Sequence, residues 1–534
     1  MNRSAAAAIA CRLLHDLVWA VVFTTVLYGS TARAGDLDPA SLSRRIDERL
    51  ELVDVPASRM ANDSDFLRRV TLDLAGRIPT ISEVHEYTSS ASEHRRSELI
   101  QRLMQSGVYY KNMAAFWRRS WVPQADTREF SSVADGFELW LTERLRTRVR
   151  YDELVAEVLT LDHARPAARP AAAIGFYAAN LSKPENLAAS STRAFLGINL
   201  DCAQCHDHPF SRWTREQFWQ TAAFFAPPSP PESESVSRLP KVRVPDTDLE
   251  YEPRFLTRAQ PQLPAQFDSV ILRRSFVDWM KSDDERLMAK NAVNRLWAHF
   301  FGEAIIEPLD DLSRDDFQTG ERAELLQELA QAFLRSDYDL DYLTAAIVGS
   351  QAYALASSPA LPAHDADDSA RAGTDQAPSS PRFRIRQATV RGLTGEQLYD
   401  SLRTAAGLPS ERPATGGADR DGRREFAALF YVERTHQAER SISQSLALMN
   451  GAFVNRLTTA DGNPTLASLL SSPFMTPDEQ VDALYLAVLA RRPSEGERFL
   501  VQRHFDDDAD AGREQQLGNL FWVLVNSAEF STNH

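Results

Sequence analysis

The sequence predicts a mainly α-helical fold, with two helical domains and few short strands. Apolar residues recur at helical spacing along most of the chain, so that Phe66, Val70 and Leu74, for example, share one helical face. Alternating apolar and polar runs, which half-buried strands require, are rare. Helix-start signals also recur, as in Thr80 followed three residues later by Glu83, which is the spacing of a capping box.

The predicted helices form two blocks on either side of a proline-rich segment. In chain order they are 66–76, 80–87, 95–104, 112–121, 136–145, 151–159, 184–196, 214–225, a helix from 269, 288–302, 324–334, 340–356, 394–406, 441–457, 477–490, 493–507 and 513–527, with short strands at 242–244 and 249–251. Residues 231–264 are a predicted linker because a helix interior does not tolerate so many prolines. The expected domains are therefore 35–230 and 265–534. The second domain contains an expected mobile insertion at 357–381, where large apolar residues are scarce.

The N-terminus has the pattern of a secretory signal. Two arginines precede an apolar run at 17–28, and small residues follow where a signal peptidase cuts. We therefore expect a signal peptide at 1–34, cleaved after Ala34. An uncleaved anchor is the weaker interpretation, because His15 and Asp16 leave an apolar run too short for about 30 Å of hydrocarbon. The sequence thus predicts an exported protein of the periplasm or cell envelope, with no transmembrane segment after cleavage.

Composition excludes several classes of function. The chain has 59 basic and 74 acidic residues and a net charge of −15, and loss of 1–34 makes this about −17. An acidic chain with scattered arginines lacks the clustered basic surface that nucleic acids or anionic membranes require. The sequence also contains no P-loop, G-x-S-x-G, H-E-x-x-H or helix-opening G-x-G-x-x-G motif. It therefore identifies no catalytic residue and no recognised hydrolase, transferase or nucleotide-binding enzyme.

One short motif carries chemistry. Cys202, Cys205 and His206 form C-x-x-C-H, the attachment sequence for c-type haem. Two thiols one helical turn apart can each bond to a vinyl group of the porphyrin, and the adjacent histidine supplies the proximal iron ligand. The predicted export agrees with this chemistry, which is completed outside the cytoplasm. The motif predicts a redox protein that binds haem c and exchanges electrons with an unknown redox or envelope protein.

Two other interpretations of the motif stay open. Cys202, Cys205, His206 and His208 can form a site for zinc or iron, although four ligands so close in sequence are sterically tight for tetrahedral zinc. Alternatively, the two cysteines can form a disulfide with no cofactor, as an oxidising compartment allows. In either case the protein has a non-redox binding or scaffolding role.

The rest of a haem site is less defined by the sequence. His208 lies too near His206 to reach the opposite haem face, and no feature selects among the other possible distal ligands. These candidates are His163, His299, Met113 and Met288. The aromatic residues after the motif either cover the macrocycle or form the buried stripe of a helix; they are Phe210, Trp213, Phe218, Trp219 and Phe225.

Six segments of the chain resemble, in order, the paired planctomycete domains of unknown function. They are FLRRVTLDLAGRIPT, GINLDCAQCHDHPFSRWTREQFWQTAAFF, KNAVNRLWAHFFG, SLALMNGAFVNRL, YLAVLARRPSEGE and LVNSAEFSTNH. The first domain of the pair is a cytochrome-C-like planctomycete domain (DUF1549), and the second is the planctomycete PSD-type domain (DUF1553). The resemblance covers nearly the whole mature chain and implies an exported protein whose activity is not established.

Overall fold

The computed structural model describes residues 38–52, 55–56, 59–126, 130–160, 171–227, 239–282, 284–312, 319–357, 384–409, 418–430, 442–507 and 511–534. The predicted signal peptide and almost all of the predicted mobile insertion lie outside these residues. Within them the fold is mainly α, as predicted, with two small antiparallel sheets. The strands are β1 (Val242–Arg243) paired with β2 (Glu250–Tyr251), and β3 (Arg391–Gly392) paired with β4 (Thr532–Asn533).

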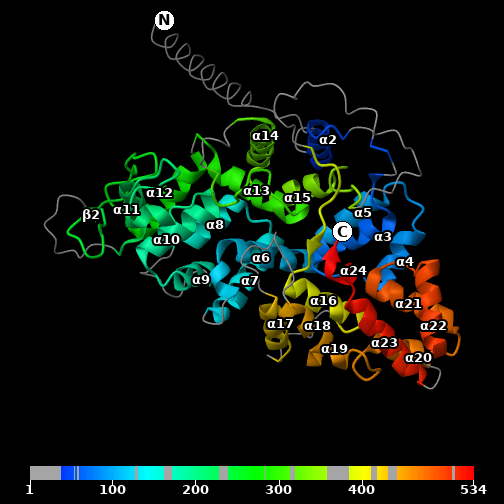
Figure 1. Ribbon diagram of the computed structural model, residues 1–534. Helices are drawn as coiled ribbons and strands as arrows, with labels where there is room; N and C mark the ends of the chain where they lie inside the picture. Colours follow the sequence, from blue (N-terminus) through cyan, green and yellow to red (C-terminus); the bar gives the residue numbers. More distant parts are fainter. Residues whose placement is uncertain are drawn as a thin grey trace, which may run out of the picture.

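The described helices lie on both sides of residue 230. The helices before residue 230 are α2 (Pro39–Arg49), α3 (Asp63–Ala75), α4 (Ile81–Ser89), α5 (Arg95–Met104), α6 (Gly107–Trp121), η3 (Pro123–Asp126), α7 (Ser131–Arg146), α8 (Tyr151–Leu159), α9 (Ala171–Ala179), α10 (Pro184–Ser191), η5 (Thr192–Leu196), η6 (Asp201–Gln204), α11 (Arg215–Ala222) and η7 (Ala223–Phe225). Those after it are α12 (Ser269–Ser282), α13 (Leu287–Phe301), α14 (Glu321–Arg335), α15 (Leu340–Val348), α16 (Gly395–Ala405), α17 (Ala418–Leu429), α18 (Ile442–Asn450), α19 (Ala452–Arg456), α20 (Pro464–Ser471), α21 (Pro477–Leu489), α22 (Glu495–Asp507), α23 (Arg513–Val525) and α24 (Ala528–Ser531). Figure 1 shows α8 to α12 at one end of the molecule and α19 to α23 at the other.

Local sequence signals account for many helix ends. The predicted capping box of Thr80 and Glu83 is present, with the Glu83 backbone N–H 3.2 Å from the Thr80 hydroxyl oxygen. Two predicted helices differ from the structure. The segment 441–457 forms two helices, α18 and α19, because the chain adopts extended geometry at Gly451 between them. The segment 340–356 stays helical only to Val348.

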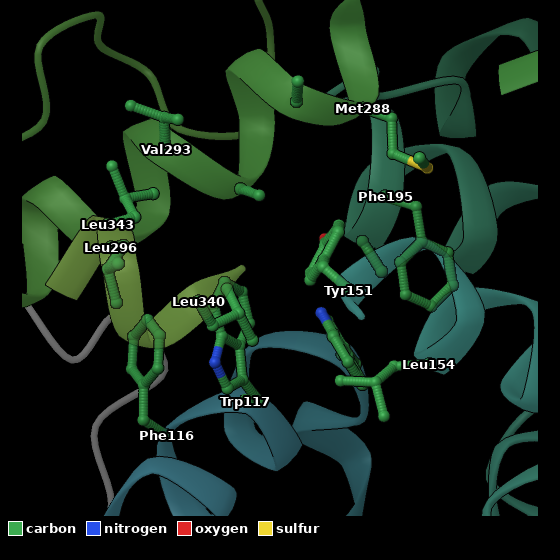
Figure 2. Close-up of a cluster of buried hydrophobic side chains, with 14 of the residues drawn as sticks. Phe116, Trp117, Tyr151, Leu154, Phe195, Met288, Val293, Leu296, Leu340 and Leu343 are labelled. Carbon is green, nitrogen blue, oxygen red and sulfur yellow. The ribbon is translucent and has the colours of Figure 1, made fainter. Parts of the chain in front are cut away.

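Apolar side chains form two hydrophobic clusters. The larger one joins helices on both sides of residues 231–264: Phe224 of η7 stacks on Phe276 of α12, with ring centroids 4.9 Å apart. In its centre, Figure 2 shows Phe116 and Trp117 of α6 close to Tyr151 of α8 and to side chains of α13 and α15. The smaller cluster consists mainly of residues from α16 to α24. The predicted domain boundaries stay a prediction, but helices on both sides of the proline-rich segment share one core.

Two buried arginines of α3 bind the C-terminal end of the chain. Arg68 donates from Nη2 to the carbonyl oxygen of Phe530 at 2.6 Å, and Arg69 donates from Nε to the carbonyl oxygen of His534 at 3.1 Å. Arg69 also donates from Nη1 to the carbonyl oxygen of Tyr353 at 2.6 Å. Burial lowers the pKa of Arg68 to about 10, so its guanidinium is still charged at neutral pH. Helix α3 thus holds together segments that lie far apart in the sequence.

Asp73, one turn further along α3, links three other segments. Its carboxylate accepts hydrogen bonds from Arg391 Nη2 at 2.8 Å, from the Tyr353 hydroxyl at 2.7 Å and from Asn533 Nδ2 at 2.8 Å. A buried charge is tolerated only when it is paired and hydrogen-bonded in this way. Helix α3, the segment after α15, strand β3 and strand β4 therefore meet at one carboxylate.

Candidate functional site

The C-x-x-C-H motif lies on a short turn that the core holds in place. Before it, η5 ends at Gly197, whose φ of 63° suits glycine and which packs closely on Leu312 and Asn291. The Gly197 carbonyl oxygen accepts a hydrogen bond from the Leu312 backbone N–H at 2.8 Å. The turn therefore starts from a backbone position that is fixed against the segment after α13.

Within the turn, the two thiols face solvent while the residue between them anchors the backbone. Cys202 and Cys205 are both exposed, and neither is in a disulfide within the described residues. Ala203 is fully buried, and the Gln204 carbonyl oxygen accepts a hydrogen bond from Trp219 Nε1 at 3.1 Å. The buried side of η6 thus holds the turn, and the exposed side presents both sulfur atoms.

His206 continues the exposed side of the turn. Its Nδ1 lies 2.8 Å from the carbonyl oxygen of Asp207, a contact that places the proton on Nδ1. In the neutral tautomer that this contact selects, the lone pair for a metal is on the other ring nitrogen, Nε2. Histidine ligands of metals usually donate their second nitrogen to a carbonyl or carboxylate in this manner. The sequence alone does not show this contact, because it depends on the backbone conformation at Asp207.

His208 has a different role in the same turn. Its backbone N–H donates to the Trp213 carbonyl oxygen at 2.8 Å, and its Nδ1 accepts from the Phe210 backbone N–H at 3.2 Å. These bonds close the loop that leads into α11. Among the described residues, no group of three or more histidine, cysteine, aspartate or glutamate side chains is arranged to hold a metal ion. The geometry therefore adds no support for a metal site made of Cys202, Cys205, His206 and His208.

The aromatic residues after the motif are mostly part of the core. Four of the five that the sequence singled out, Trp213, Phe218, Trp219 and Phe225, are buried in the larger hydrophobic cluster. Phe210 is the exception, with 82% of its surface exposed. The aromatic stripe therefore stabilises the fold beneath the turn, and Phe210 is the member that remains available to a ligand there.

The candidate distal ligands that the structure describes do not share the surface of the turn. Met113 and Met288 are buried in the larger cluster. His299 packs against Phe116 with ring centroids 4.4 Å apart and the ring planes tilted, and burial lowers the pKa of His299 to about 4. His163 lies outside the described residues. The structure thus brings Cys202, Cys205 and His206 together, whereas it places three of the four distal candidates in the protein interior.

Comparison with protein families identifies two regions. Residues 41–229 match a family model described as a protein of unknown function (DUF1549), and residues 272–425 match another described as a protein of unknown function (DUF1553). No curated protein and no solved structure matches the chain. In the part of the chain that the structure describes, no helix has both the length and the apolar content needed to cross a membrane. The chain therefore contains a DUF1549 region followed by a DUF1553 region, and both of these families are described as proteins of unknown function.

Proposed function

We propose that this chain is an exported electron-transfer protein that carries one c-type haem on Cys202 and Cys205, with His206 as the iron ligand. The observation that carries the proposal is the contact between His206 Nδ1 and the Asp207 carbonyl oxygen at 2.8 Å. This contact leaves Nε2 for the iron, on the same exposed turn that presents both thiols.

The residues of the turn suit covalent attachment. Each thiol adds across one vinyl group: a C–S bond forms, the thiol hydrogen moves to the other vinyl carbon, and the double bond becomes single. The reaction requires reduced, accessible sulfur atoms, and Cys202 and Cys205 provide them. Bound haem supplies a one-electron iron couple. His206 sets the position of the iron, while the buried Ala203 keeps the turn from shifting.

A non-redox binding or scaffolding role is the competing function, and one observation favours it. The aromatic residues that follow the motif pack beneath the turn rather than beside it, so that Phe210 is the one member of that group exposed next to the thiols. In that role, the cysteines and His206 form a metal site or a disulfide that stabilises the turn.

The test is to express the protein in a host with a cytochrome c maturation system and record its absorption spectrum. We expect a red protein whose colour stays with the polypeptide through acid–acetone extraction, because thioether bonds do not release the macrocycle. His206→Ala should remove the iron ligand and most of the coloured product. His208→Ala is the matched control and should keep both, because Nδ1 of His208 is engaged within the loop.

A colourless protein from a host that matures a reference cytochrome would refute the proposal. Elemental analysis and thiol counting of the same sample would then separate the competing roles. Bound zinc or iron with chelator-sensitive stability indicates a metal site. Two thiols that appear only after reduction indicate a disulfide.

A further inference from the structure

A cleft lies where the DUF1549 and DUF1553 regions meet. It has a volume of about 50 Å³, and α3, α6 and α7 form one wall, while α16 and α17 form the other. A single water molecule needs about 10–15 Å³ of such cavity volume, so the cleft has room for a few water molecules. A group the size of sulfate, phosphate or carboxylate therefore fits, and pockets at domain junctions are frequent ligand sites.

The cleft has an excess of positive charge. Four cationic side chains line it against two carboxylates: Arg77, Lys111, Arg403 and Arg423 against Glu138 and Asp400. Arg77 is itself paired with Glu83, with Nη1 2.8 Å from the carboxylate, so the positive excess comes from the other cations. Both carboxylates are already engaged by guanidinium groups. Glu138 accepts from Arg118 Nε at 2.7 Å, and Asp400 accepts from Arg423 Nη2 at 2.7 Å. The chain as a whole carries a net charge of −15, so a positive cleft is a local feature that composition does not explain.

The pKa of a neighbouring carboxyl group, that of Glu396, indicates the sign of the electrostatic potential near the cleft. Glu396 is only 16% exposed, and it lies 3.2 Å from Arg119 and 3.6 Å from Arg118. Burial is the largest single influence and acts to raise its pKa. The combined fields of Arg119, Arg423 and Arg118 outweigh burial and lower the pKa to about 2. The potential beside the cleft is therefore strongly positive.

The ion pairs around the cleft also leave one guanidinium N–H donor of Arg423 available. Arg423 uses Nε and Nη2 on Asp400, and its Nη1 has no acceptor among the described residues. Arg403 is held in place by the Pro409 carbonyl oxygen at 2.8 Å. Arg403 and Arg423 are thus positioned before any ligand arrives, which reduces the ordering cost of binding.

We propose that this cleft binds a small oxyanion between the DUF1549 and DUF1553 regions, with Lys111, Arg403 and Arg423 as its cationic contacts. The guanidinium groups supply planar pairs of donors that match sulfate, phosphate or carboxylate oxygens. The inference depends on neither haem nor metal at the cysteine turn, so each can fail without the other.

The test is isothermal titration of the purified protein with sodium sulfate, sodium phosphate and sodium acetate, with sodium chloride at equal ionic strength as the reference. We expect saturable binding of at least one oxyanion with a dissociation constant of about 1 mM or tighter. Preference for sulfate or phosphate identifies a tetrahedral ligand, and preference for acetate identifies a carboxylate. Heats that match those of chloride for all three salts would overturn the proposal.

Variants locate the site. Lys111→Gln and Arg403→Gln should each weaken the binding at least about ten-fold, which corresponds to the loss of one charge-assisted contact. Arg503→Gln is the matched control, because Arg503 is exposed and pairs loosely with Asp507, and it should bind as the parent does. Val108→Glu places a carboxylate at the cleft and should abolish binding without removing any cation. Unchanged affinity in all three cleft variants, with helical content verified by circular dichroism, would contradict the assignment.

Discussion

Replacement of Asp73 by asparagine tests whether the buried carboxylate holds the ends of the chain together. The Asp73 side chain is 1% exposed and 2.8 Å from Arg391, whose own side chain is 15% exposed. Asp73→Asn keeps the size but removes the charge that Arg391, Tyr353 and Asn533 all face. Loss of one partner of a buried pair costs about 3–5 kcal/mol of unfolding free energy. Total stabilities are about 5–15 kcal/mol, so the effect should be large.

A matched control separates burial from pairing. Asp248 pairs with Arg243 at 2.7 Å, nearly the same distance, but the Asp248 side chain is fully exposed. Asp248→Asn should therefore leave the urea concentration at the midpoint of unfolding nearly unchanged. The assay is urea denaturation followed by far-ultraviolet circular dichroism. If both variants unfold at the same urea concentration as the parent, the carboxylate does not hold these segments together and the reasoning is wrong.

Two further predictions concern groups with shifted pKa values. Glu396 has a pKa of about 2 in the folded protein, against an ordinary 4.5, so its contribution to stability is complete above pH 4.5 and is lost as pH falls toward 2. Glu396→Gln should remove this part of the acid sensitivity, which is measured as the change in melting temperature between pH 5 and pH 3. A melting temperature that falls equally in parent and variant would count against it. His299 has a pKa of about 4 in the folded protein, against an ordinary 6.5 in the unfolded chain. Because the unfolded chain therefore binds the proton first, the folded protein loses stability as pH falls from 6.5 to 4. His299→Phe should reduce the loss of stability over that pH range and leave any haem attachment unchanged; a loss of haem would instead make His299 a ligand.

The sequence predicts those parts of the fold that depend on local signals. The capping residues Thr80 and Thr214 start helices as expected, because their side chains satisfy backbone donors within three residues. Helices α2, α9, α17, α20 and α24 are not among the predicted helices. Helix α20 has only eight residues, which are too few to show a clear helical period of apolar side chains. Its N-cap, Asn463, becomes recognisable only in the structure.

Contacts between distant segments are not visible in the sequence. The shared core across residues 231–264 depends on Phe224 reaching Phe276, and no local pattern specifies that pairing. The same limit applies to function. The sequence identifies Cys202, Cys205 and His206 by their spacing, but it does not reveal the charged cleft. The charged cleft residues come from α6, α7, α16, α17 and the segment after α3, and in the sequence each resembles an ordinary surface charge.

Covalent haem at the cysteine turn is tested most directly by the mass of the peptide that contains Cys202 and Cys205. The protein is expressed with a cytochrome c maturation system, digested and analysed by mass spectrometry without reduction. We expect one haem mass on this peptide, no haem mass in the double variant Cys202→Ala/Cys205→Ala, and unchanged haem in His208→Ala. A peptide of unmodified mass, or one that is lighter by two hydrogens because of a disulfide, would contradict the claim.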